Sequence, residues 1–183
     1  MKLIFVTGNS KKFAEAKAIL EGVDLVQERF DITEIQGSAM DVVKDKARKA
    51  LARFNKPLFV EDTSLEFQSL GGLPGPYIIH FLEAIGPEGL YRILKDYPDK
   101  RARAVCLAAY IEPGTDPVVF EGSIKGSVVS PRGHQDFGFD YVFMPDGYDK
   151  TFAEMEKDEK NKISHRSLAI RKLYDFVKNH PMA

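Results

Sequence analysis

The pattern of apolar and polar positions along the chain predicts strands and helices in mixed order. Leu3–Val6 and Pro57–Val60 are short apolar runs typical of buried strands. Arg101–Glu112 and Val118–Val129 have the pattern of two long strands, joined as a hairpin by a loop that contains two prolines and a glycine. Shorter extended segments are expected at 23–28 and 30–35.

Helical spacing of apolar residues predicts several helices between these strands. They are expected at Lys11–Leu20, Ala39–Phe54, Ile79–Ala84, Glu88–Asp96 and from Ser164 to about Asn179. A loop dense in glycine and proline at 71–76 precedes the third of them. Because strands and helices intermix without strict alternation, we predict an α/β fold around a mixed β-sheet with flanking helices.

The length and composition narrow the class of protein. A chain of 183 residues with 44% hydrophobic residues suits one domain, or one domain with two lobes. The net charge of −1 argues against bulk electrostatic binding to nucleic acid. No apolar run is long enough to span a membrane, and the first residues lack the organisation of a signal peptide, so we expect a cytoplasmic protein. The single cysteine, Cys106, is expected in a buried strand.

A polar turn joins the first predicted strand to the first predicted helix. Gly8 and Asn9 tolerate positive φ, Ser10 can cap the helix, and Lys11 and Lys12 place two positive charges in its first turn. A helix N-terminus attracts anions, and cations at that end need a negative partner. A phosphate would serve, although an ordinary turn with two solvated lysines explains the segment equally well. Because the chain contains no Walker A or dinucleotide-binding motif, any phosphate site must combine several segments.

Acids at the ends of extended segments are candidates for metal binding. Glu61 and Asp62 follow a predicted buried strand where we expect a loop to begin, and Glu34 ends another extended segment. Glu61 and Asp62 should point to opposite sides if the strand alternation persists. Carboxylates from two segments suit Mg²⁺, which binds few carboxylates together with waters and substrate phosphates, although a turn or cap role is commoner for any single acid. Lys46, at the margin of a helical apolar stripe, can send its ammonium group into a cleft or into solvent.

Aromatic and basic residues gather in two later segments. Asp136–Phe143 places aromatic rings beside glycine, where they can stack on a nucleobase or pack in the core. Lys160, His165 and Arg166 place donors near the predicted start of the last helix, where they suit phosphate and base acceptors. Ser164 and His165 do not resemble a nucleophile and its base, because adjacent helical residues point about a quarter-turn apart.

Six segments of the chain resemble, in the same order, the motifs of the inosine triphosphate pyrophosphatase family. The resemblance extends from Leu3 to the final helix, and its segments are Thr7–Lys12, Glu61–Leu65, Gly72–Tyr77, Phe137–Asp140, Thr151–Met155 and Lys160–Arg166. Each segment is a weak signal alone, but six in one order at compatible spacing are specific. The resemblance implies an enzyme that cleanses the nucleotide pool. It would hydrolyse non-standard purine nucleotides (ITP, dITP and XTP) to the monophosphate and pyrophosphate.

The resemblance also implies an architecture. Members of this family have an elongated two-lobed α/β fold around a long mixed sheet, with the active cleft between the lobes, and they are typically homodimers. Residues 1–183 would then be a single catalytic domain with two lobes. The substrate would be a purine nucleoside triphosphate, and neither nucleic acid nor a membrane would be a partner.

Residue roles follow from the resemblance position by position. Lys12, Lys46 and Lys160 match lysines that hold the triphosphate, and the first two belong with Asp62 to the predicted catalytic set. Glu34 and Asp62 match the acids that organise Mg²⁺ and the attacking water. The other predicted substrate-binding residues, which shape the phosphate loop or surround the base and sugar, are Thr7, Gly8, Asn9, Thr63, Phe137, Gly138, Phe139, Asp140, Ser164, His165 and Arg166.

Two positions depart from the family pattern. Many relatives have glycine where Ser64 stands, which bears on the backbone after Asp62, and many have tryptophan or tyrosine where Phe139 stands.

The alternatives are a pyrophosphatase acting on modified pyrimidine nucleotides, a nucleotide-binding module without catalysis, and a domain without cleft chemistry. The ordered motifs and the retained Glu34, Asp62 and Lys12 favour the purine pyrophosphatase.

Overall fold

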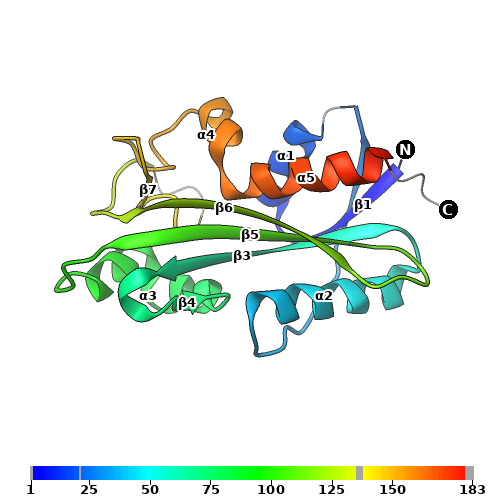
Figure 1. The fold of residues 1–183 in the computed structure, drawn as a ribbon, viewed down its shortest axis with the longest axis horizontal. Coiled ribbons are helices and arrows are strands. Elements are labelled where there is room, and N and C mark those ends of the chain that lie inside the picture. Colours follow the sequence, from blue (N-terminus) through cyan, green and yellow to red (C-terminus); the bar gives the residue numbers. More distant parts are fainter. Residues whose placement is uncertain (1, 21, 135–137, 180–183) are drawn as a thin grey trace. The chain divides into compact units, whose positions relative to one another are not determined.

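The computed structural model describes residues 2–20, 22–134 and 138–179. Within them, seven strands form one mixed sheet in the order β2-β1-β3-β5-β6-β7, with β4 paired to β3 (Figure 1). β1 pairs in parallel with β2 and β3, whereas β4 and β7 pair antiparallel with β3 and β6. The strand bounds are β1 Lys2–Val6, β2 Asp24–Glu28, β3 Leu58–Phe67, β4 Pro74–Gly75, β5 Arg101–Ile111, β6 Val118–Val128 and β7 Phe143–Pro145. The prediction of an α/β fold around a mixed sheet is confirmed.

Five α-helices lie within the described residues. They are α1 Ser10–Ile19, α2 Ala39–Phe54, α3 Ile78–Ile93, α4 Lys157–Ile163 and α5 His165–Asn179, and the 3₁₀-helix η1 is Gln68–Leu70. α3 is interrupted at Gly86, which has φ 66° and ψ 175° and precedes Pro87, so the prediction of two helical stretches there is confirmed. α4 was not predicted, because seven residues are too few to show an amphipathic period.

The bounds of α2 agree with the prediction because both ends carry strong signals. The Ser38 hydroxyl accepts a hydrogen bond from the Asp41 N–H at 3.2 Å, which caps the N-terminus. Asn55 ends the helix in the left-handed conformation with φ 47°. Between these caps the apolar stripe that includes Val43 and Ala47 is buried.

β3 extends beyond its predicted end. The strand was expected to give way to a loop at Glu61 and Asp62, but it continues to Phe67, so both acids lie in mid-strand. The prediction failed because two acids interrupt the apolar run, whereas apolar burial resumes at Leu65 and Phe67. Ser64, which stands in place of the family glycine, is a buried strand residue. The segment 30–35 forms no strand.

The described residues form two compact units, drawn from alternating parts of the chain. Unit 1 takes residues from Met1–Asp62, Cys106–Gly122 and His165–Ala183, and unit 2 takes residues from Thr63–Val105 and Ser123–Ser164. None of the described helices is both long and apolar enough to cross a membrane.

Unit 1 has a hydrophobic core on the sheet face that α1 and α5 cover. α2 lies on the other face (Figure 1). Phe5 of β1 and Phe59 of β3 are fully buried in this core and stack with their ring centroids 4.3 Å apart. Cys106 is buried in β5 as predicted. Helices therefore cover both faces of the sheet at β3, with α1 and α5 on one face and α2 on the other.

Unit 2 has a separate hydrophobic core. Leu65 and Phe67 of β3 contribute to it, together with Leu90 of α3 and an aromatic group. In that group the Phe143 ring lies 5.2 Å from the ring of Phe152.

Candidate active site

The turn between β1 and α1 is organised by Asn9. The Asn9 side-chain oxygen accepts hydrogen bonds from the N–H groups of Lys11 and Lys12 at 3.0 and 3.1 Å, and the Asn9 N–H donates to the Thr7 hydroxyl at 3.1 Å. Ser10 was predicted as the cap, but it is the first helical residue, because the Asn9 oxygen is the one that reaches these two N–H groups. Asn9 therefore satisfies two of the free N–H groups at this helix end, and the lysine side chains remain the main attraction for an anion.

Glu61 lies at the centre of a buried charged cluster in unit 1. Its carboxylate forms an ion pair with the Lys12 ammonium, accepts a hydrogen bond from the Arg166 Nε at 3.0 Å and lies 3.3 Å from the Cys106 Sγ. Arg166 is also paired with Glu15. Burial would raise the pKa of Glu61, but Lys12 and Arg166 together lower it well below its ordinary value. Glu61 is therefore ionised at neutral pH despite being buried.

Asp62 contacts a different lysine. The Lys46 Nζ of α2 lies 3.3 Å from the Asp62 Oδ1, and the same ammonium forms an ion pair with Glu34. The Asp62 Oδ2 is buried and has no hydrogen-bond partner among the described residues. Such an atom is costly unless a ligand, ion or water completes it, so it identifies a position where a bound group belongs.

The pKa values of Asp62 and Lys46 are shifted in directions that suit proton transfer. Burial raises the pKa of Asp62, and the nearby Glu34 and Glu61 add to the effect, while Lys46 and Lys12 oppose it. Burial would lower the pKa of Lys46, but Asp62 and Glu34 outweigh burial and raise it. Asp62 thus accepts a proton more readily than an exposed aspartate, whereas Lys46 remains charged.

The alternation of β3 explains why neighbouring acids have separate partners. Glu61 meets side chains from α1 and α5, and Asp62 meets a side chain from α2 on the other face. The prediction that these two acids point to opposite sides is confirmed. Each of the two lysines predicted to be catalytic is held by one of the two acids.

Glu34 and Asp62 are the residues that could hold a divalent cation. Both carboxylates reach the Lys46 ammonium, so a positive charge already lies at their meeting point. Within the described part of the chain, no group of three or more histidine, cysteine, aspartate or glutamate side chains could enclose a metal ion. Two carboxylates, one with an unpartnered oxygen, fit the coordination of Mg²⁺, which takes its other ligands from waters and substrate phosphates.

Unit 2 holds a second group of predicted residues. The Lys160 ammonium of α4 forms a buried ion pair with Asp140 and lies 5.7 Å from the centroid of the Phe152 ring. Phe139 is only 5% exposed and packs edge-to-face on Phe143 with centroids 6.1 Å apart. The core therefore occupies most of the Phe139 ring and leaves little of it for a nucleobase.

The remaining predicted residues are placed as follows. Thr63 follows Asp62 in β3, and Gly138 has a positive φ of 53°. Ser164 is buried and ends α4 immediately before α5, whose first residues are the buried His165 and Arg166. Gly8 lies in the turn that Asn9 organises, and Phe137 lies outside the described residues.

Sequence reasoning considered Glu61 only as a neighbour of Asp62 in a pair of acids and gave no role to Glu15, although both contact predicted site residues. Glu15 lies three residues after Lys12, one turn along α1, so helical spacing could have suggested it. The contact of Glu61 with Arg166 joins residues 105 positions apart, and no local pattern reveals it.

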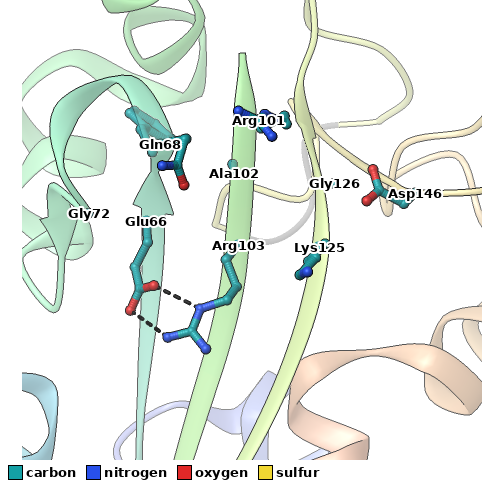
Figure 2. Close-up of a pocket in the computed structure, with 10 residues that line it drawn as sticks. Glu66, Gln68, Gly72, Arg101, Ala102, Arg103, Lys125, Gly126 and Asp146 are labelled. Carbon is teal, nitrogen blue, oxygen red and sulfur yellow. Dashed lines mark hydrogen bonds and ion pairs between the residues drawn. The ribbon is translucent and has the colours of Figure 1, made fainter. Parts of the chain in front are cut away.

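The sheet in unit 2 also carries a hollow of about 220 Å³. Figure 2 shows Glu66 of β3 and Arg103 of β5 pointing toward one another across it, and two hydrogen bonds of 2.9 and 3.3 Å join them. Arg101, also at the hollow, is paired with Asp99 at 2.7 Å. None of the predicted site residues lines the hollow, and carboxylates pair with both of its arginines.

Comparisons with known proteins show the family to which the chain belongs. A sequence model described as the Ham1 family matches residues 3–176. An inosine triphosphate pyrophosphatase of Ajellomyces capsulatus is 50% identical over 97% of this chain and 97% of its own. The structure of a HAM1 protein from Coxiella burnetii superimposes with a TM-score of 0.88 at 26% identity, covering 98% of this chain and 100% of that one. A nucleoside-triphosphatase, or dITP/XTP pyrophosphatase, from Mycobacterium abscessus is 31% identical with a TM-score of 0.74, and the match covers 100% of both chains.

Proposed function

Because this chain belongs to the Ham1 family, we propose that it is a nucleoside-triphosphate pyrophosphatase acting on non-standard purine nucleotides. It hydrolyses ITP, dITP and XTP to the nucleoside monophosphate and pyrophosphate. Water attacks the α-phosphorus, a new P–O bond forms, and the bond between that phosphorus and the bridging oxygen of the pyrophosphate breaks. The enzyme removes these nucleotides from the pool of triphosphates.

One observation carries the assignment of residues. In unit 1 two lysines stand beside two acids of one strand, and the buried Asp62 Oδ2 has no hydrogen-bond partner among the described residues. Lys12 and Lys46 bind the phosphate oxygens, where their charges stabilise the negative charge that builds up during attack. Thr7, Gly8 and Asn9 form the turn that holds Lys12 over the phosphates.

Asp62 activates the attacking water. Its Oδ2 accepts the proton that the water loses, and burial, which raises the pKa of Asp62, favours that transfer. Lys46 stays bound to the Asp62 Oδ1 and keeps the carboxylate oriented while the other oxygen reacts.

The carboxylates of Glu34 and Asp62 suit Mg²⁺ as the cofactor. Glu34 and Asp62 would hold it, and when bound it would neutralise phosphate oxygens and assist the departure of pyrophosphate. Lys46 lies between the same carboxylates and keeps them together before the metal arrives.

The base is chosen by hydrogen-bond polarity. Hypoxanthine and xanthine present an oxygen acceptor at position 6, which suits donors from His165, Arg166 or nearby backbone N–H groups. Adenine presents an amino donor there, which leaves a buried group unpaired at a cost of about 1–3 kcal/mol, or roughly one to two orders of magnitude in rate.

Product analysis tests this function directly. The purified chain is incubated with ITP, XTP, dITP, GTP and ATP, with and without Mg²⁺, and the phosphate product is identified. We expect pyrophosphate from the first three substrates in the presence of Mg²⁺. Release of orthophosphate, or equal rates with ITP and ATP, would contradict the proposal.

We further propose that the protein is a cytoplasmic homodimer, in keeping with the family resemblance. Light scattering at micromolar concentration checks the oligomeric state, and a monomer would refute the dimer while leaving the proposed chemistry in place.

A further inference from the structure

Glu61 connects two residues that we assign to substrate binding. Its side chain is 1% exposed, and its carboxylate contacts Lys12 from α1 and Arg166 from α5. Glu15 binds Arg166 as well, so two carboxylates and two cations form a balanced cluster. Glu61 contacts both cations, whereas Glu15 is paired with Arg166.

Lys12 differs from the other members of the cluster in its access to solvent. The Lys12 side chain is 21% exposed, whereas the Arg166 side chain is 1% exposed. A free lysine side chain samples many rotamers, and a ligand that binds it must first order it. Because Glu61 is buried and fixed by Arg166, its contact orders the Lys12 ammonium before any ligand arrives.

We propose that Glu61 is a positioning residue of the pyrophosphatase reaction, whose carboxylate holds Lys12 in the orientation that receives the triphosphate. This inference rests on the proposed function. The arrangement parallels that of Lys46, which is held by the neighbouring Asp62 from the opposite face of β3. Glu61 touches no substrate and acts through Lys12.

The first test is the nearly isosteric Glu61→Gln, which removes the charge and keeps the volume. We expect the KM for ITP to rise at least about tenfold, because an unanchored Lys12 binds the ground-state phosphates less well. A residue that only supports folding would reduce the amount of active enzyme, and so kcat, at unchanged KM. The control is Glu66→Gln, which makes the same change at another acid of β3, where the ion pair with Arg103 is more exposed, and it should leave both constants unchanged.

A double-mutant cycle shows whether Glu61 acts through Lys12. Lys12→Met is combined with Glu61→Gln, and KM is measured for both single variants and the pair. If Glu61 acts through Lys12, the second substitution has little effect once the lysine is gone. Additive effects, or a KM for Glu61→Gln within about threefold of wild type, overturn the proposal. Glu61→Asp keeps the negative charge, so its KM should lie close to the wild-type value. The same variant can replace Glu61→Gln in the cycle if the glutamine variant does not fold.

A measurement without nucleotide separates this inference from the proposed function. In protein labelled with ¹³C at the lysine Cε, the Lys12 signal is assigned by its loss in Lys12→Met. We expect this signal to be shifted in wild type and to move to the position of solvent-exposed lysines in Glu61→Gln. An unchanged signal overturns the role of Glu61. A wild-type protein that releases no pyrophosphate refutes the proposed function instead.

Discussion

Substitution of Gly122 by alanine should damage the site from a distance, because Gly122 lies directly beneath the start of α5. A Cβ on this residue would lie 2.1 Å from the His165 carbonyl oxygen and 2.4 Å from the Ala169 backbone nitrogen. Ordinary contact begins at 3.4 Å, so the oxygen must retreat by 1.3 Å, and it belongs to backbone that cannot rotate away. Overpacking of this kind typically costs about 1–3 kcal/mol of stability.

The same displacement carries His165 and Arg166 with it, so we expect activity to fall as well. A misplacement of about 1 Å can cost about 10²-fold in rate, and we expect a loss of that size in kcat/KM for ITP. Urea unfolding and pyrophosphate release, measured on the same preparations, check both effects.

Gly37→Ala is the matched control for this experiment. A Cβ there would meet the Asp41 Cβ at 3.5 Å, which is ordinary contact, so stability and kcat/KM should be unchanged. If Gly122→Ala retained wild-type stability and wild-type kcat/KM, the close packing of α5 against β6 would be wrong.

Three further predictions follow from burial and charge. Asp62→Asn should lower kcat by about 10²–10⁴-fold without unfolding the protein, and near wild-type turnover in a folded variant would exclude Asp62 as the base. Phe59→Ala, which removes a fully buried ring stacked on Phe5, should cost about 3–5 kcal/mol in urea unfolding, and a loss under about 1 kcal/mol would contradict the packing described. Because the folded-state pKa of Glu61 is lowered, its stabilising contribution is complete above its ordinary pKa of 4.5 and is lost as the pH falls below it. Urea midpoints measured from about pH 6 to pH 2 should therefore fall more steeply in wild type than in Glu61→Gln, and parallel curves would refute this assignment.

The elements that were predicted correctly are those with caps, stop residues and apolar periodicity in their own sequence. Helix 39–54 has a serine cap, an apolar stripe and an asparagine stop, and its bounds agree with the prediction. β3 was predicted too short because two acids in mid-strand resemble a strand end. Pairing with Lys12, Arg166 and Lys46 offsets the cost of burying these acids. α4 lacked a readable period because it has only seven residues.

The candidate site was predictable as a set of residues but not as a set of contacts. The family resemblance predicts Lys12, Lys46, Glu34 and Asp62 as site residues, and in the structure Glu34 and Asp62 both contact the Lys46 ammonium. The pairing of Lys12 with Glu61 depends on which face of β3 meets α1, and this follows from tertiary packing and not from local pattern. The same holds for the burial of Phe139, whose glycine-flanked segment gives no sign that the ring turns inward.

The mid-strand position of the two neighbouring acids restricts how this gene can change in length. Deletion of a single codon between Leu58 and Glu61 would exchange the faces of the two carboxylates, because side chains along a strand alternate with a period of two. Asp62 would then face Lys12 and Arg166, and Lys46 would lose its contact with Asp62 and keep the one with Glu34. A point substitution in this stretch changes one contact at a time, whereas an insertion or deletion changes the acid partners of both Lys12 and Lys46 at once. Descendants of this sequence should therefore vary freely in the length of their loops and keep the number of residues in this strand.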